Sequence, residues 1–140
     1  MIEFDSLTDF ELQNEERLRT WIEDVIKNEG YELGELLFVF CDDDYLHRIN
    51  LEFLKHDTLT DVITFDYNMG KQVNSEIFIS IDRVADNATD FGVSFEQELH
   101  RVMIHGIFHL CGFKDELEPD IEIIRSKEDG ALHVLQNDIQ

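Results

Sequence analysis

The sequence predicts an α+β fold, built as one domain over residues 1–140. Short runs rich in apolar, β-branched or aromatic residues predict strands at residues 1–5, 36–40, 62–65 and 75–81. The stretches between and after them repeat apolar residues at helical spacing, and no linker, repeat or low-complexity tract interrupts them. A chain of 140 residues with 43% hydrophobic residues suits one domain with a sizeable core and excludes a disordered chain.

The first three elements follow from local patterns. Residues 1–5 alternate weakly between apolar and polar side chains, which predicts a short strand. Asn14 followed by Glu15 and Glu16 predicts a helix start, and Gly30 predicts its end. The helix has one apolar face, which consists of Leu18, Trp21, Ile22, Val25 and Ile26. The continuous apolar run 36–40 predicts a strand that is buried on both faces.

The middle of the chain predicts a helix and a β-hairpin. Three carboxylates at residues 42–44 cap free amide groups at a helix start, and we prefer this interpretation to a metal site. That helix is expected to end near residues 55–57. The strand at 62–65 and its return strand at 75–81 are joined by a turn signal at 68–71.

Three helices are predicted in the remainder of the chain. A short helix over residues 83–90 ends at Gly92, and a longer one begins at Ser94, where Ser94 and Gln97 match a capping box. The longer helix has an apolar stripe of Leu99, Val102, Met103 and Leu110, which we expect to be buried. Pro119, a favoured first-turn residue, opens the last helix.

Charge and targeting signals limit where the protein works and what it binds. The net charge of −21 argues against broad, non-specific nucleic-acid binding and fits a basic protein partner or high solubility. An anionic substrate would need a local cationic patch or a metal ion. No apolar run reaches the roughly 20 residues of a membrane helix, and the N-terminus lacks a signal-peptide pattern, so we expect a cytoplasmic protein. Cys41 and Cys111 are expected to be reduced and buried.

The chemistry centres on His105 and His109. Residues four apart project from the same face of a helix, one turn apart, so both imidazoles can reach one metal ion. Gly112 predicts the end of that helix, and Asp115 can then turn back toward the histidines. Zinc with three protein ligands keeps an open position and lowers the pKa of bound water to about 7. The histidine pair alone is a weak signal, and the glycine turn and the carboxylate strengthen it.

Neighbouring residues refine this hypothesis. A zinc protease would need Glu directly after the first histidine as its general base, and Gly106 occupies that position. Glu98 lies two turns before His105 on the same face, where it either orients an imidazole or belongs to a solvated face. Lys55 is either a second cation at the site or a solvated surface lysine.

The run from His105 to Asp115 resembles the signature of the YbeY family of bacterial metal-dependent endoribonucleases, which act in ribosomal RNA maturation. Supporting matches lie at residues 49–55, 60–65, 75–80, Ser94 and 98–99, so the resemblance covers roughly residues 35–135. It implies a small mixed β-sheet flanked by helices, with the metal site on a helix and the turn after it. It also implies cleavage of single-stranded RNA, linked to maturation and quality control of the small ribosomal subunit.

The same resemblance implies a set of site residues. The metal ligands would be His105, His109 and Asp115, and Lys55 would occupy the place of an arginine that the family uses in catalysis. The chain departs from the family where Asp115 replaces a third histidine. A carboxylate is a competent zinc ligand that also suits harder ions, so we expect one Zn²⁺, with Mn²⁺ or another divalent ion as the alternative. Lysine keeps the positive charge but loses the two-pronged grip of arginine on phosphate.

Two other functions fit the same residues. The protein could be a ribosome-assembly factor that works mainly by binding ribosomal RNA or basic ribosomal proteins, with a structural metal. It could also be a metal-dependent hydrolase of a smaller substrate. For the nuclease, the nucleophile is either water or the 2′-hydroxyl of the RNA.

Overall fold

The computed structural model describes residues 1–54 and 60–139. In chain order it contains β1 (Ile2–Ser6), α1 (Glu15–Asn28), β2 (Glu32–Cys41), α2 (Asp43–Phe53), β3 (Val62–Asp66), β4 (Gln72–Ser80), α3 (Ile81–Phe91), α4 (Phe95–Leu110) and α5 (Glu118–Ile139). Within these ranges no helix is long and apolar enough to cross a membrane.

The strands form one mixed sheet in the order β1-β2-β4-β3. β1, β2 and β4 run parallel, with Phe4 opposite Phe38 and Phe38 opposite Ile77. β3 pairs antiparallel with β4 as an edge strand, with Ile63 opposite Phe78, so the predicted hairpin is confirmed. The predicted α+β class, a small mixed sheet flanked by helices, is also confirmed.

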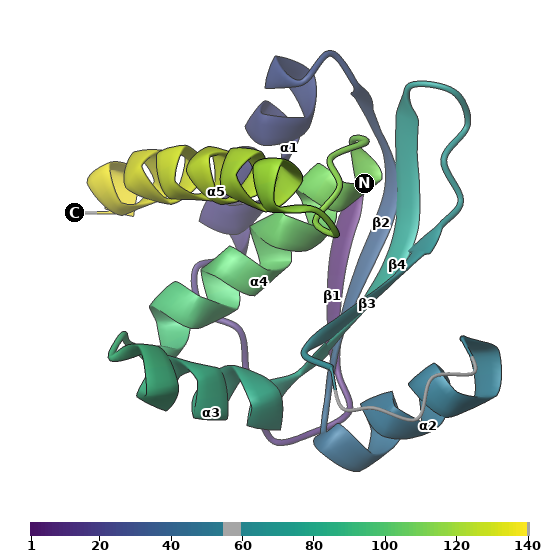
Figure 1. Cartoon of the computed structure of the whole chain (residues 1–140), viewed down its shortest axis with the longest axis vertical. Coiled ribbons are helices and arrows are strands. Elements are labelled where there is room, and N and C mark those ends of the chain that lie inside the picture. Colours follow the sequence, from purple (N-terminus) through teal and green to yellow (C-terminus); the bar gives the residue numbers. More distant parts are fainter. Residues whose placement is uncertain (55–59, 140) are drawn as a thin grey trace.

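The helices cover the two faces of the sheet unequally. Figure 1 shows α1, α4 and α5 on one side of the strands and α2 on the other. The main core lies on the α4 side, and the predicted apolar stripe of α4 is buried in it. Trp21 is also part of this core, as predicted, and its Nε1 donates a hydrogen bond to the carbonyl of Ala131 in α5 at 2.9 Å. A smaller cluster of Cys41, Leu46, Ile49 and Ile63 holds α2 against the opposite face.

Local capping signals were accurate at two helix starts. The Ser94 hydroxyl accepts from the amide of Gln97 at 3.1 Å, and the Gln97 side chain accepts from the amide of Ser94 at 3.0 Å. At α2, the Asp42 carboxylate accepts from the amide of Tyr45 at 2.8 Å, which confirms capping by the first of the three acids.

Three details differ from the sequence prediction. Ile81, predicted to end the return strand, is the first residue of α3. Asn14 precedes α1 as predicted, but it adopts a left-handed conformation with φ of 60° and makes no side-chain cap. β2 begins at Glu32, earlier than its apolar run, and its pairing with β4 shifts register between Leu33 and Leu36. The predicted end of the second helix near residues 55–57 lies outside the described residues.

Candidate functional site

The predicted site lies in a cavity of about 540 Å³ between α4, β3 and the end of α2. His105 and His109 of α4 line it, together with Asp115 from the turn after that helix. The facing wall comes from residues 60–64 at and before β3, and Asn50 and Leu54 close the side nearest α2. The structure therefore brings all three predicted metal ligands to one cavity.

The turn after α4 places Asp115 beside His105. The amide of Phe113 donates to the carbonyl of Phe108, and the amide of Gly112 donates to the carbonyl of His109, each at 3.1 Å. These two bonds, with Gly112 at φ of 97°, form a Schellman motif, and the rings of Phe108 and Phe113 pack at 5.6 Å between centroids. The chain reverses there, and Asp115 Oδ2 comes to 3.1 Å from His105 Nε2.

His109 shares the cavity but completes no preformed cluster. It is exposed, one helical turn beyond His105. Among residues 1–54 and 60–139, no three His, Cys, Asp or Glu side chains are already gathered closely enough to hold a metal ion. The donor types nevertheless fit a divalent ion, because two imidazoles and one carboxylate face the same solvent-accessible space.

Gly106, between the two histidines, allows α4 to approach the sheet closely. A Cβ atom at this position would lie 3.2 Å from Cγ2 of Thr64 in β3 and 3.7 Å from Cγ2 of Ile77 in β4. Gly106, which occupies the position of the general-base glutamate of a zinc protease, thus has a packing role. It lets the helix that carries the histidines lie directly against the wall of the cavity.

A buried polar layer supports His105 from the side away from the cavity. Glu128 of α5 places Oε2 at 2.6 Å from His105 Nδ1, and its other oxygen, Oε1, accepts from Nη1 of Arg101 at 2.9 Å. The Glu128 side chain is only 5% exposed. Its hydrogen bond to the imidazole, together with its charge and that of Asp115, raises the pKa of His105 against the opposing effect of burial.

Two further carboxyl groups lie close to this layer. Burial raises the pKa of Asp61, although the positive charge of His105 acts in the opposite direction. Burial also raises the pKa of Glu98, and the charge of Asp61 adds to the effect. Glu98 is therefore a buried residue near the polar layer, which excludes a solvated face, one of its two predicted environments.

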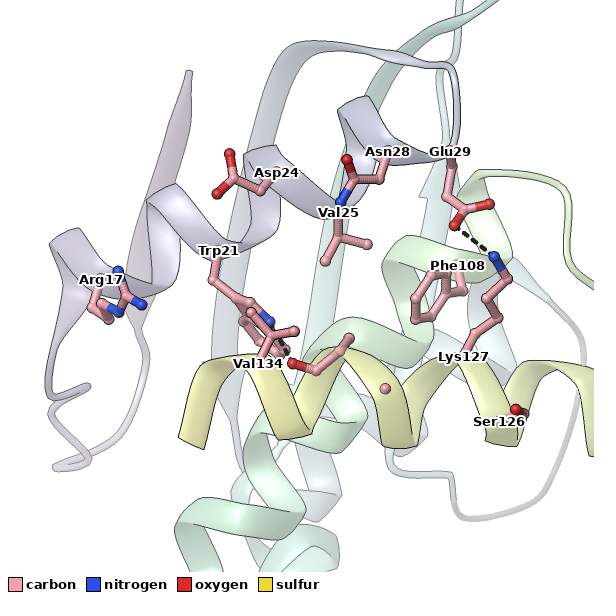
Figure 2. A pocket seen from close by; sticks show the side chains of 12 residues that line it. Arg17, Trp21, Asp24, Val25, Asn28, Glu29, Phe108, Ser126, Lys127 and Val134 are labelled. Carbon is pink, nitrogen blue, oxygen red and sulfur yellow. Dashed lines mark hydrogen bonds and ion pairs between the residues drawn. The ribbon is translucent and has the colours of Figure 1, made fainter. Parts of the chain in front are cut away.

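A second cavity, of about 380 Å³, lies between α1 and α5 (Figure 2). Trp21, Val25, Phe108 and Val134 give it an apolar surface, and Lys127 Nζ and Glu29 Oε2 form an ion pair of 3.0 Å at one end. It contains none of the predicted site residues. Its described lining includes no histidine or cysteine.

Sequence reasoning did not identify Glu128, Arg101 or Asp61 as site residues. A usable signal existed for Glu128, because it falls within the apolar face of the last helix, between Ile124 and Leu132. An acid in the middle of a buried stripe needs a partner, and this acid has two. Lys55 lies outside the described residues.

Comparisons with known proteins find matches over nearly the whole chain. The family model described as Endoribonuclease YbeY matches residues 4–136. Proteins of that name from Flavobacterium johnsoniae and Flavobacterium psychrophilum are similar to the chain. The first is 54% identical, covering 94% of this chain and 95% of that protein. The second is 51% identical, covering 98% and 100% respectively. A solution structure of a Thermotoga maritima protein matches with a TM-score of 0.69 and 26% identity, covering 99% of this chain and 91% of that one.

Proposed function

This chain belongs to the YbeY endoribonuclease family, and from that membership we propose that it cleaves single-stranded RNA with a divalent metal ion held by His105, His109 and Asp115. The observation that carries the proposal is the 3.1 Å approach of Asp115 to His105 inside the cavity that His109 also lines. Two ligands of one ion must come this close to each other, and the Schellman turn brings them together.

A bound ion would supply Lewis-acid stabilisation of the charge that develops on the scissile phosphate. The two histidines and the aspartate suit Zn²⁺, and the carboxylate leaves Mn²⁺ as the alternative. Three protein ligands leave room at the ion for substrate, and the open cavity gives RNA access to it.

The chain's own residues would bind and orient the RNA around that point. Thr60 and Thr64 line the cavity wall that faces the histidines. The Thr60 hydroxyl donates to the carbonyl of Val62 at 3.3 Å, so its oxygen is left to accept from a ribose hydroxyl, and Thr64 supplies a second hydroxyl group. We assign Lys55 the role of a cation that pairs with phosphate. Asn50 of α2 and Leu54, which follows that helix, line the cavity, which supports this assignment. Lysine attracts phosphate as a point charge and does not hold it in a fixed orientation.

The acidity of the protein bears on how RNA reaches the site. A net charge of −21 repels a polyanion over much of the surface. We therefore propose that RNA is presented within a ribosomal particle, where basic ribosomal proteins bind the acidic surface. This places the activity in the cytoplasm, in maturation of ribosomal RNA and quality control of the small subunit.

The ends of the RNA products identify the nucleophile. A 2′,3′-cyclic phosphate would mean attack by the neighbouring 2′-hydroxyl, whereas a 5′-phosphate would mean attack by water. Mass spectrometry of the fragments from one defined oligonucleotide separates the two. The proposal of a nuclease fails if fully metal-loaded protein produces no RNA fragments.

The same acidity favours one alternative function, a ribosome-assembly factor that acts mainly by binding and uses its metal structurally. Metal removal distinguishes this assembly factor from a nuclease. In that case the metal-free protein unfolds, while the metal-loaded protein binds ribosomal particles and cuts no RNA. For the nuclease we expect the metal-free protein to stay folded, because its core is large and separate from the three ligands.

A further inference from the structure

We infer that Glu128 is a positioning residue for His105: from a buried site on α5 it fixes the tautomer and orientation of the imidazole, so that Nε2 presents its lone pair to the cavity. The inference deepens the proposed function, on which it rests for the assignment of His105 as a metal ligand.

The contact defines which ring nitrogen carries the proton. A carboxylate accepts hydrogen bonds and donates none, so a neutral His105 ring that hydrogen-bonds to Glu128 Oε2, 2.6 Å away, carries its proton on Nδ1. In a neutral ring the other nitrogen, Nε2, is then unprotonated. Nε2 is the atom that lies 3.1 Å from Asp115 Oδ2, on the cavity side. The free lone pair therefore points to the place where the predicted ligands converge.

The competing contact is weaker. Asp115 could in principle hold the proton on Nε2, but its side chain is 42% exposed, against 5% for Glu128. The contact to Glu128 is also shorter by 0.5 Å, the difference between 3.1 and 2.6 Å. A hydrogen bond to a buried carboxylate is less screened by water and stronger, so it determines the tautomer.

Arg101 fixes the glutamate in turn. Its Nη1 donates to Glu128 Oε1 at 2.9 Å, while its Nη2 donates to Asp129 Oδ1 at 2.6 Å. The two oxygens of Glu128 therefore accept from two different donors, one on each side. Glutamine has nearly the same size but only one accepting oxygen. Its NH₂ group would therefore lie against an N–H group of either Arg101 or His105, and two donors cannot form a hydrogen bond with each other.

This arrangement makes Glu128→Gln the informative variant, because it preserves packing and removes one acceptor. The matched control is Asp129→Asn, which changes the neighbouring partner of Arg101 and leaves the contact between Glu128 and His105 in place. A role limited to joining α4 and α5 would predict reduced thermal stability in Glu128→Gln with no change at the imidazole.

The first readout needs neither metal nor RNA. In the metal-free protein, at a pH where the ring is neutral, two-bond ¹⁵N–¹H correlation spectra distinguish the Nδ1–H from the Nε2–H form of His105. We expect the Nδ1–H form in the wild type and in Asp129→Asn, and a mixture or the Nε2–H form in Glu128→Gln. A wild type in the Nε2–H form, or a Glu128→Gln spectrum identical to the wild type, would overturn the inference.

The second readout is zinc affinity, measured by competition with a chromophoric chelator. We expect Glu128→Gln to bind zinc about 10- to 100-fold more weakly and Asp129→Asn to match the wild type. Unchanged affinity in Glu128→Gln would contradict the positioning role. If the wild type shows the Nδ1–H form that Glu128→Gln loses, yet the wild type binds neither zinc nor manganese, the positioning role stands and the proposed function fails.

Discussion

His105 Nε2 and Asp115 Oδ2 lie 3.1 Å apart although ten positions and the end of a helix separate these residues. The contact depends on the Schellman turn, which stops α4 at Leu110 and reverses the chain within five residues. A helix that continued by one more turn would carry Asp115 along the axis, away from His105. The position of Asp115 relative to His105 thus depends on the turn that ends α4 as well as on the helix itself.

Gly112→Ala is therefore expected to damage both stability and metal binding. Gly112 has φ of 97°, where an alanine is strained by roughly 1–2 kcal/mol. The turn would relax and displace Asp115, so we expect a lower melting temperature and weaker zinc binding. The two can be measured by thermal unfolding and by chelator competition.

Gly130→Ala is the matched control and should have the opposite effect on stability. Gly130 lies inside α5, and a Cβ atom there would meet nothing within 4 Å. Alanine in a helix interior is more stable than glycine by up to about 1 kcal/mol. We expect a higher melting temperature with unchanged zinc affinity. If Gly112→Ala and Gly130→Ala both lower the melting temperature and the zinc affinity, the left-handed turn at Gly112 is not the reason for the effect.

A double-mutant cycle tests the close packing of α4 on β3. Alanine at position 106 brings a Cβ atom to 3.2 Å from Cγ2 of Thr64, and serine at position 64 removes that methyl group while it retains the hydroxyl. We expect the effect of Gly106→Ala on the free energy of unfolding to be more favourable by about 1 kcal/mol in the Thr64→Ser background than in the wild type. Denaturant unfolding of the four proteins gives this coupling, and a coupling near zero would show that the methyl group moves aside freely.

Glu98→Gln should stabilise the protein at neutral pH. Burial and then the charge of Asp61 raise the pKa of Glu98 above its ordinary value of 4.5, so the ionised form is disfavoured in the folded state. Protonated Glu98 makes a favourable contribution to the free energy of unfolding. This contribution is complete below pH 4.5 and is lost as pH rises through the folded-state pKa. We expect the variant to have a higher melting temperature than the wild type at pH 7.

This gain should shrink as the pH is lowered toward 4.5, where Glu98 is increasingly protonated in the wild type as well. Glu122→Gln, on the exposed face of α5, provides the matched control for loss of a glutamate charge. A Glu98→Gln variant that is less stable than the wild type at pH 7 would show that the carboxylate is needed in its charged form.

The two cysteines should be unreactive in the folded protein. Burial, with nearby acids, raises the pKa of Cys41 to about 12 and that of Cys111 to about 11, from 9.0. At pH 8 almost no thiolate is present, so we expect very slow reaction with a disulfide reagent such as DTNB. Reaction of both thiols should follow unfolding in guanidinium chloride. Rapid reaction of one thiol in native buffer would contradict the structure.

The same shifts give a stability trend at alkaline pH. The folded protein retains the thiol protons above pH 9.0, where the unfolded chain begins to lose them. This contribution to the free energy of unfolding is complete below pH 9 and declines as pH rises toward 11 and 12.

Features that depend on neighbouring residues could be predicted from the sequence. The capping box at Ser94, the cap at Asp42 and the turn at Gly112 each use atoms within a few positions, and each occurs as predicted. The histidine spacing is also local, because the geometry of a helix alone places both rings on one face.

Features that depend on tertiary contacts could not be predicted in the same way. Glu128 reaches His105 across 23 positions, and no local pattern shows that α5 crosses α4 at this point. The early start of β2 is similar: Asn74 of β4 accepts from the amide of Glu35 at 2.8 Å, a contact between strands distant in sequence. Asn14 illustrates a third case, since its type suits a cap but its left-handed backbone prevents the side chain from making one.

The most direct test of the account is cleavage of a single-stranded RNA oligonucleotide by zinc-loaded protein, with and without chelator, beside the His105→Ala/His109→Ala double variant. His133→Ala, which changes an exposed histidine of α5, is purified in the same way as a control for contaminating nucleases. We predict cleavage by the wild type and by His133→Ala, and loss of cleavage in the double variant and in chelator. Cleavage that persists in the double variant, or a wild type that cuts nothing when loaded with either zinc or manganese, would contradict the account.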